Sequence, residues 1–180
     1  MNSMSFLINT LFDLYLMVVL LRLWLQWAKA DFYNPFSQFV TKATNPLLRP
    51  LRRIVPGWGG FDFASLVLAL LVAAAKVVTL QLVVHGGISL PTVAINTVLT
   101  VFKEAFSLVF WVLIFRAILS WVSQGQNPIE AVLHQLTEPM LAPLRKVLPP
   151  MGGFDLSIMV LLLGLQFLQI LMGDVLGLLL

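Results

Sequence analysis

The chain consists of long apolar runs joined by more polar connectors. Four runs are long enough to cross a membrane as helices, at residues 6–28, 63–84, 98–122 and 156–178. At about 1.5 Å of rise per residue, a run of about 22 to 25 residues reaches roughly 33 to 37 Å, which exceeds a hydrocarbon core of about 30 Å. The runs are continuous and do not alternate with polar residues, which disfavours barrel strands. The pattern therefore predicts an all-α membrane protein with four transmembrane helices.

Composition favours the same class. Hydrophobic residues make up 59% of the 180 residues and charged residues only 11%, which leaves too few polar side chains to cover a soluble surface. The net charge of +3 is spread thinly, so we expect no nucleic-acid partner. Cysteine is absent. His85 and His134 are far apart, and we expect neither to have a carboxylate neighbour at the spacing of metal ligands. We therefore expect no metal and no cofactor.

Lysine and arginine are distributed unevenly among the connectors. The two connectors that are rich in cations carry Lys29, Lys42, Arg49, Arg52 and Arg53 between the first two spans, and Arg145 and Lys146 between the last two. Between the second and third spans the only cation is Lys103, which lies near the predicted helix start. Because cytoplasmic connectors are enriched in lysine and arginine, we expect both basic connectors in the cytoplasm and both termini on the opposite side.

A phrase that precedes the second span recurs before the fourth. The segment PLRRIVPGWGGFD at residues 50–62 returns as PLRKVLPPMGGFD at residues 143–155, a shift of 93 residues. The motif R-x-x-x-x-W at residues 22–27 also returns, at residues 116–121. Each copy contains two spans, so the copies have the same orientation in the membrane. We predict two parallel tandem repeats, at residues 1–84 and 98–180, joined by a non-cytoplasmic linker at residues 85–97.

These motifs resemble those of the YggT family of bacterial integral membrane proteins, whose relatives include YlmG-type proteins of chloroplasts. The shared pattern is R-x-x-x-x-W, then N-P, T-x-P-x-L-x-P-L-R and P-x-x-G-G-F-D, and it occurs in both halves of the chain. The resemblance implies a multi-pass protein of the bacterial inner membrane, in which the termini expected opposite the cytoplasm would be periplasmic. It implies links to osmotic stress and cell-division operons and, in plastids, to cytochrome haem attachment and nucleoid organisation. A proline that often follows the aspartate motif in the family is missing here.

The repeated phrase predicts a tight turn and a helix cap. Proline fixes φ, and the glycine pairs Gly59-Gly60 and Gly152-Gly153 permit a close turn. The aspartates that follow, Asp62 and Asp155, are suited to cap the next helix and to complement its dipole. We also expect them to pair with Arg22 and Arg116, which lie roughly 9 Å inside the preceding spans, where an arginine must pair or snorkel.

Between the spans, apolar side chains recur at three- and four-residue spacing, as at Phe36, Phe39 and Val40. This spacing predicts amphipathic connector helices at the membrane surface. The basic residues Arg49, Arg52, Arg53, Arg145 and Lys146 would then face anionic headgroups. Prolines 46, 50, 139 and 143 predict two short helical pieces per connector. Trp27 and Trp121 fit the position of interfacial anchors.

Four polar residues lie deep within predicted spans: Asp13, Lys76, Gln166 and Gln169. Asp13 and Lys76 fall at similar depth in two antiparallel spans, which predicts an ion pair between them. Polar residues at such depth are candidates for function, because an unpartnered charge in hydrocarbon costs a few kcal/mol. The pair is either structural or part of an ion or proton pathway.

No motif for a nucleophile, a phosphate loop or a dinucleotide is present, so we do not expect an enzyme. Two functions remain. The first is a membrane scaffold or assembly factor in osmotic or envelope stress, whose connectors recruit anionic lipids, further copies of the chain or other inner-membrane proteins. The alternative is an oligomeric ion channel or transporter involved in osmotic regulation.

Overall fold

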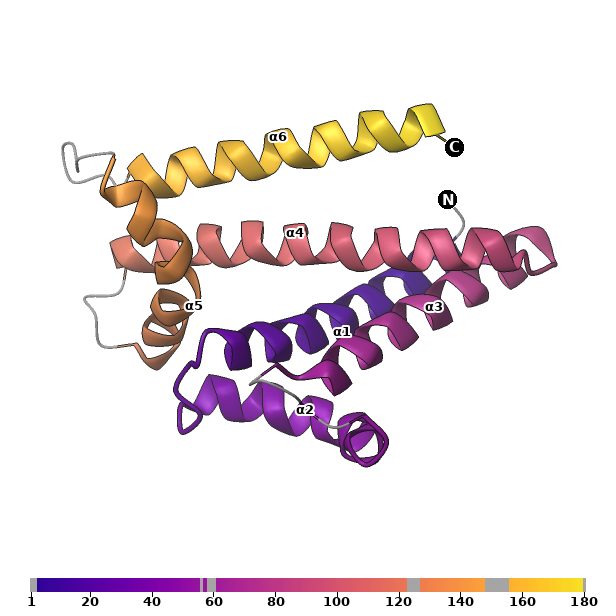
Figure 1. Ribbon diagram of the computed structural model, residues 1–180, viewed down its shortest axis with the longest axis horizontal. Coiled ribbons are helices and arrows are strands. Elements are labelled where there is room, and N and C mark those ends of the chain that lie inside the picture. The colour runs from indigo at the N-terminus through magenta and orange to yellow at the C-terminus, as the bar shows by residue number, and fades with distance from the viewer. Residues whose placement is uncertain (1–2, 56, 58–60, 123–126, 148–155, 180) are drawn as a thin grey trace. The chain divides into compact units, whose positions relative to one another are not determined.

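The computed structural model describes residues 3–55, 57, 61–122, 127–147 and 156–179 (Figure 1). Within these ranges it contains six helices and no strand. The helices are α1 (Ser3–Trp27), α2 (Pro35–Arg52), α3 (Phe63–His85), α4 (Leu90–Val122), α5 (Pro128–Arg145) and α6 (Leu156–Leu179). Helices α1, α3, α4 and α6 are long and apolar enough to cross a membrane. The predicted all-α architecture with four spans is confirmed.

The chain divides into two compact units, Met1–Leu108 and Val109–Leu180, and helix α4 contributes to both. The connector helices α2 and α5 each contain 18 residues and correspond position by position under the shift of 93. Each begins with proline after an asparagine cap, and the side chains of Asn34 and Asn127 accept the N–H of Phe36 and Ile129. The arrangement of the two halves as parallel repeats stays a prediction.

The core of the first unit lies between α1 and α3, which run antiparallel (Figure 1). Helix α1 contributes Leu16 and Val19, which have no exposed surface, and α3 contributes a stripe of small residues that includes Ala64 and Ala73. Small side chains let two helices approach closely, which is how helices associate in lipid. Helix α2 packs across the ends of both and buries Ser37, Val40, Thr44 and Leu48.

Both ends of α3 are capped by residues typical of helix termini. Asp62 caps its first turn, and its side chain accepts the N–H of Ser65 at 3.3 Å. Gly86 ends the helix with a φ of 67°, a left-handed conformation that glycine adopts without steric penalty, and its N–H reaches the carbonyl of Leu82. The predicted cap at Asp62 is confirmed, whereas Asp155 and the glycines at 59, 60, 152 and 153 lie outside the described residues.

The prediction of two short helices per connector was wrong. Helices α2 and α5 each continue through two prolines, Pro46 and Pro50 in α2 and Pro139 and Pro143 in α5. Prolines four residues apart fall on one side of a helix, and all four are exposed, so the lost hydrogen bonds lie on the side that faces away from the unit. Each connector is therefore one helix that its prolines kink but do not interrupt, as the change of direction within α2 shows (Figure 1).

The third span also begins earlier than predicted. Helix α4 starts at Leu90, so residues 90–97 of the predicted linker are helical. Pro91 lies in the first turn of α4, where proline is tolerated because its missing N–H would have no intrahelical partner. The carbonyl of Ser89 accepts the N–H of Val93, which sets the first turn. As a result Glu104 lies well inside α4 and not near its start.

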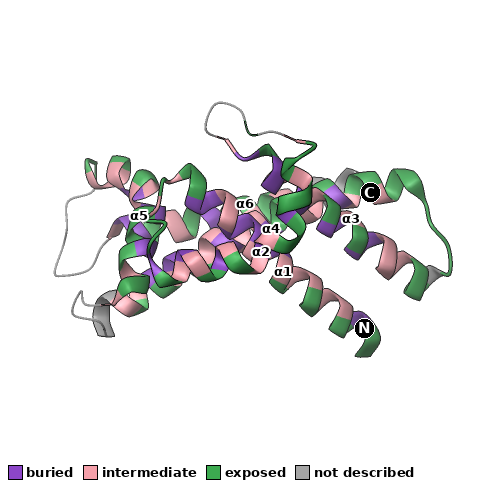
Figure 2. Ribbon diagram, turned by 90° about the horizontal axis from the view of Figure 1, so that it is seen from below, coloured by how far each residue is buried: buried purple, intermediate pink, exposed green. Residues whose placement is uncertain are grey.

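The spanning helices carry many exposed positions (Figure 2), and large hydrophobic residues occupy many of them. The buried share of the spanning windows ranges from 11% in α6 to 33% in α3. Large exposed residues include Leu11 and Leu14 in α1 and Leu71 in α3. Such a surface requires an apolar solvent, as expected for a multi-pass membrane protein.

Candidate functional site

A charged cluster lies among the spanning helices of the first unit. Lys76 Nζ of α3 donates to Asp13 Oδ1 of α1 at 2.5 Å, which confirms the predicted ion pair. Lys76 is 9% exposed, and Glu104 of α4, which is 6% exposed, interacts electrostatically with both partners. No ion pair within 4.0 Å joins Glu104 to another described residue. The cluster therefore brings two carboxylates and the ammonium group of Lys76 within electrostatic range of one another inside the spanning helices, with Lys103 next to Glu104 in the chain.

Sequence reasoning missed the part that Glu104 plays. The late start predicted for the third span put Glu104 near a helix end, where a charged residue needs no partner. The apolar run that begins at Leu90 was the available signal, because it moves Glu104 into the middle of a helix of 33 residues.

A second ion pair holds the start of α3. Arg52, in the last turn of α2, donates to Asp62 Oδ2 at 2.5 Å, and the hydroxyl of Ser65 donates to the same oxygen at 2.7 Å. Asp62 is 3% exposed. The expected pair between Asp62 and Arg22 was wrong, because α2 packs across the ends of α1 and α3 and brings Arg52 to the carboxylate.

The environment of Asp62 lowers the pKa of its carboxyl. Burial alone would raise this pKa, but the hydrogen bonds from Arg52 and Ser65 and the positive charge of Arg52 outweigh it. The ionised form is therefore favoured in the folded state. The resulting stabilisation is fully present above the unfolded-state pKa and is lost as the pH falls through the lower folded-state pKa.

We expect Asp62→Asn to lower the free energy of unfolding by about 1.5 to 3 kcal/mol, because it removes a charge-assisted hydrogen bond while an asparagine still caps the helix. Chemical unfolding in a mild detergent, followed by tryptophan fluorescence, measures this loss. The difference between the wild type and the variant should shrink as the pH falls through the acidic range. A difference that does not change with pH would show that the Asp62 charge contributes nothing.

Arg22 of α1 has a different partner from the one predicted. Its guanidinium donates to the hydroxyl of Thr41 in α2, and no ion pair within 4.0 Å reaches it from a described residue. A cavity of about 240 Å³ opens beside this contact. Its lining combines Arg22, Gln26, Ser37 and Thr41 with the apolar residues Leu25, Ala30 and Phe32.

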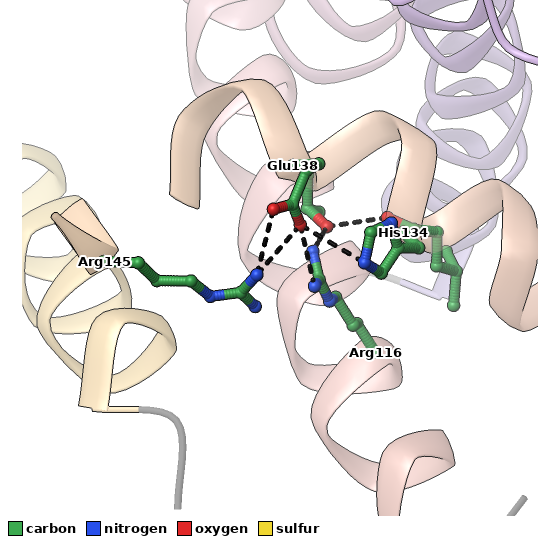
Figure 3. A network of polar contacts seen from close by, with 6 residues as sticks. Arg116, His134, Glu138 and Arg145 are labelled. Carbon is green, nitrogen blue, oxygen red and sulfur yellow. Dashed lines mark hydrogen bonds and ion pairs between the residues drawn. The ribbon is translucent and has the colours of Figure 1, made fainter. Parts of the chain in front are cut away.

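In the second unit one glutamate contacts three basic side chains (Figure 3). Glu138 of α5 pairs with Arg116 at 3.2 Å, with Arg145 at 2.9 Å and with His134 at 3.3 Å. Arg116 also donates to the hydroxyl of Thr137. The expectation that His134 had no carboxylate neighbour was wrong, since Glu138 follows it by one helical turn. The predicted partner of Arg116, Asp155, lies outside the described residues.

The other predicted site residues occupy simpler positions. Arg49, Arg53 and Lys146 are exposed, whereas Arg52 and Arg145, expected to face lipid, form ion pairs within the chain. Gln166 of α6 is exposed and Gln169 is half-buried. Trp27 is 57% exposed at the end of α1, where an interfacial anchor was expected. Trp121 lies in the last turn of α4, but its side chain is not among those described.

Comparisons with known proteins identify the family. The CCB3/YggT family model matches residues 1–83 and 95–176. An uncharacterized protein in the proC 3′ region of Vibrio alginolyticus is 57% identical over 98% of this chain and 97% of its own length. The uncharacterized protein YggT of Escherichia coli K12 is 49% identical over 98% of this chain and 92% of its own. No solved structure matches the chain significantly. The chain therefore belongs to the CCB3/YggT family.

Proposed function

We propose that this protein is a non-enzymatic scaffold or assembly factor of the bacterial inner membrane, with α2 and α5 lying in the cytoplasmic interface. In this arrangement the connector helices offer basic residues to anionic headgroups and an apolar side to the membrane. Further copies of the chain or other inner-membrane proteins would bind on this face. The family resemblance suggests that the role serves the response to osmotic or envelope stress.

One observation carries the proposal. Leu47 and Leu51 of α2 share an open apolar groove of about 510 Å³ with residues of the spanning helices α1 and α3. The spanning residues that line it are Leu11, Phe12, Tyr15, Leu68, Leu71, Val72 and Ala75. A connector that floated in water would expose these leucines to solvent. Sharing a groove with membrane-spanning side chains supports a position of α2 at the bilayer surface, with its leucines towards the acyl chains.

The opposite side of α2 has the complementary character. Lys42 and Arg49 are exposed, and on an α-helix they point away from Leu47 and Leu51. The face formed by Ser37, Val40, Thr44 and Leu48 is buried against the unit. Helix α2 therefore presents three faces, one to the protein, one to lipid and one to the headgroups.

Cysteine labelling tests this placement, because the natural chain contains no cysteine. We expect Arg49→Cys to react with a membrane-impermeant maleimide applied to the cytoplasmic side of inverted vesicles. Leu47→Cys, two residues away, should be labelled at least about tenfold more slowly, since the acyl region excludes the charged reagent. Equal labelling of the two cysteines, or labelling of Arg49→Cys only from the opposite side, would contradict the proposal.

The buried cluster of Asp13, Lys76 and Glu104 favours a second candidate, an oligomeric ion or proton pathway. Ionisable residues inside the membrane are uncommon outside such pathways, and Glu104 has no ion-pair partner in the described chain. Reconstitution in liposomes with a proton-sensitive dye separates the candidates. Flux that disappears in Glu104→Gln would favour a pathway and count against a purely structural role, whereas the scaffold proposal predicts no flux.

A further inference from the structure

The cavity beside Arg22 has the features of a binding site for a phosphate group. Arg22, Gln26, Ser37 and Thr41 supply polar groups from α1 and α2. The volume of about 240 Å³ equals that of roughly eight liquid waters at about 30 Å³ each, which is ample for a phosphate and the atoms next to it. Ser37 is 4% exposed, and its hydroxyl has no hydrogen-bond partner among the described residues. The site therefore has a free hydroxyl as well as a cation.

The charge of Arg22 is not neutralised within its own unit. Arg22 interacts electrostatically with Arg52 and Asp62, but those two residues already form an ion pair with each other. The contact that Arg22 does make, to the hydroxyl of Thr41, carries no charge. Arg22 lies five residues before the end of α1, or about 7.5 Å along the helix axis, where an unneutralised cation is costly in lipid. An external anion would remove this cost.

The second unit shows how the chain neutralises the corresponding arginine. Arg116, the counterpart of Arg22 in the repeat, pairs with Glu138. Under the shift of 93 residues, Glu138 corresponds to Asn45, which has no charge. The first repeat therefore has no residue equivalent to the Glu138 carboxylate. The cavity lies beside Arg22, the arginine that lacks this carboxylate.

We propose that this cavity binds the phosphate group of an anionic phospholipid, with the guanidinium of Arg22 and the hydroxyl of Ser37 as its ligands. Ser37 lies in the first turn of α2, where the helix dipole also favours an anion. Leu25 and Phe32 give the cavity an apolar wall that suits a lipid better than free phosphate. This cavity is separate from the exposed basic residues of the connectors. The lipid proposal therefore does not depend on the scaffold proposal.

The test counts lipid molecules that stay bound. Protein is incorporated into nanodiscs of phosphatidylcholine with an equal amount of phosphatidylglycerol, released into mild detergent and analysed by native mass spectrometry. We expect one phosphatidylglycerol per chain to be retained, and Arg22→Gln to reduce its retention about tenfold, because a charge-assisted hydrogen bond is lost. Arg49→Gln removes the same charge from the exposed side of α2 and should leave retention unchanged.

Two further arms complete the experiment. Ser37→Ala removes only a hydroxyl, so it keeps the test valid if Arg22→Gln fails to fold, and retention should fall several-fold. Inorganic phosphate added during release should displace little of the lipid. The proposal would be overturned by equal retention in the wild type, Arg22→Gln and Ser37→Ala. Its lipid part would be overturned if inorganic phosphate displaced all bound phosphatidylglycerol.

Discussion

Lys76→Met should lower the free energy of unfolding by about 3 kcal/mol, since breaking a buried ion pair leaves its partner charged and unpaired. Lys76 is the common neighbour of Asp13 and Glu104, so its loss leaves Asp13 without its ion-pair partner and Glu104 with only the charge of Lys103 nearby. Unfolding in mild detergent, followed by tryptophan fluorescence, measures the change. The amount of folded protein recovered from membranes should fall in parallel.

The matched variants make this expectation specific. Asp13→Asn should be less harmful than Lys76→Met, because Glu104 remains near the lysine to offset its charge. Thr79→Ala, about one turn further along α3, removes an exposed hydroxyl that bonds to the helix's own backbone, and it should change stability by less than about 0.5 kcal/mol. A loss in Asp13→Asn as large as that in Lys76→Met would mean that Glu104 does not share the lysine.

Local rules predicted much of this fold. Each span was visible as an apolar run, and the cap at Asp62 followed from an aspartate placed directly before one of them. The pair of Asp13 and Lys76 was also predictable, because two antiparallel helices of known ends place residues at equal depth. These features depend on one helix, or on two helices joined by a single connector.

Features that depend on how a connector packs could not be predicted in the same way. Arg22 and Asp62 lie near the same membrane surface, but the sequence does not show that α2 lies across both helix ends. Because α2 lies across these ends, Arg52 forms an ion pair with Asp62, and Arg22 donates a hydrogen bond to Thr41. The prolines were misjudged for a related reason, since their effect depends on whether their side of the helix faces solvent or the protein.

The glutamate of the second unit was missed because its role requires three partners from two helices. Arg116 comes from α4, while His134 and Arg145 come from α5, one turn before Glu138 and two turns after it. The spacing of His134 and Glu138 was a signal in the sequence, because residues four apart are neighbours on a helix. The position of Arg116 against them depends on the packing of α5.

We expect Glu138→Gln to lower the free energy of unfolding by about 1.5 to 3 kcal/mol, because it removes the carboxylate that accepts charge-assisted hydrogen bonds from Arg116 and Arg145. Arg145→Gln removes a partner of Glu138 that is 35% exposed, so the loss of this contact should cost less than about 1 kcal/mol. The same detergent unfolding assay compares the two variants.

A double-mutant cycle shows which pair carries the energy. Arg116→Gln combined with Glu138→Gln removes both charges, and the difference between its effect and the sum of the two single effects measures the coupling of this pair. If Glu138→Gln and Arg145→Gln had equal effects, Glu138 would serve only the outer pair. Arg116 would then gain no stability from Glu138, which would weaken the contrast with Arg22 that supports the phosphate site.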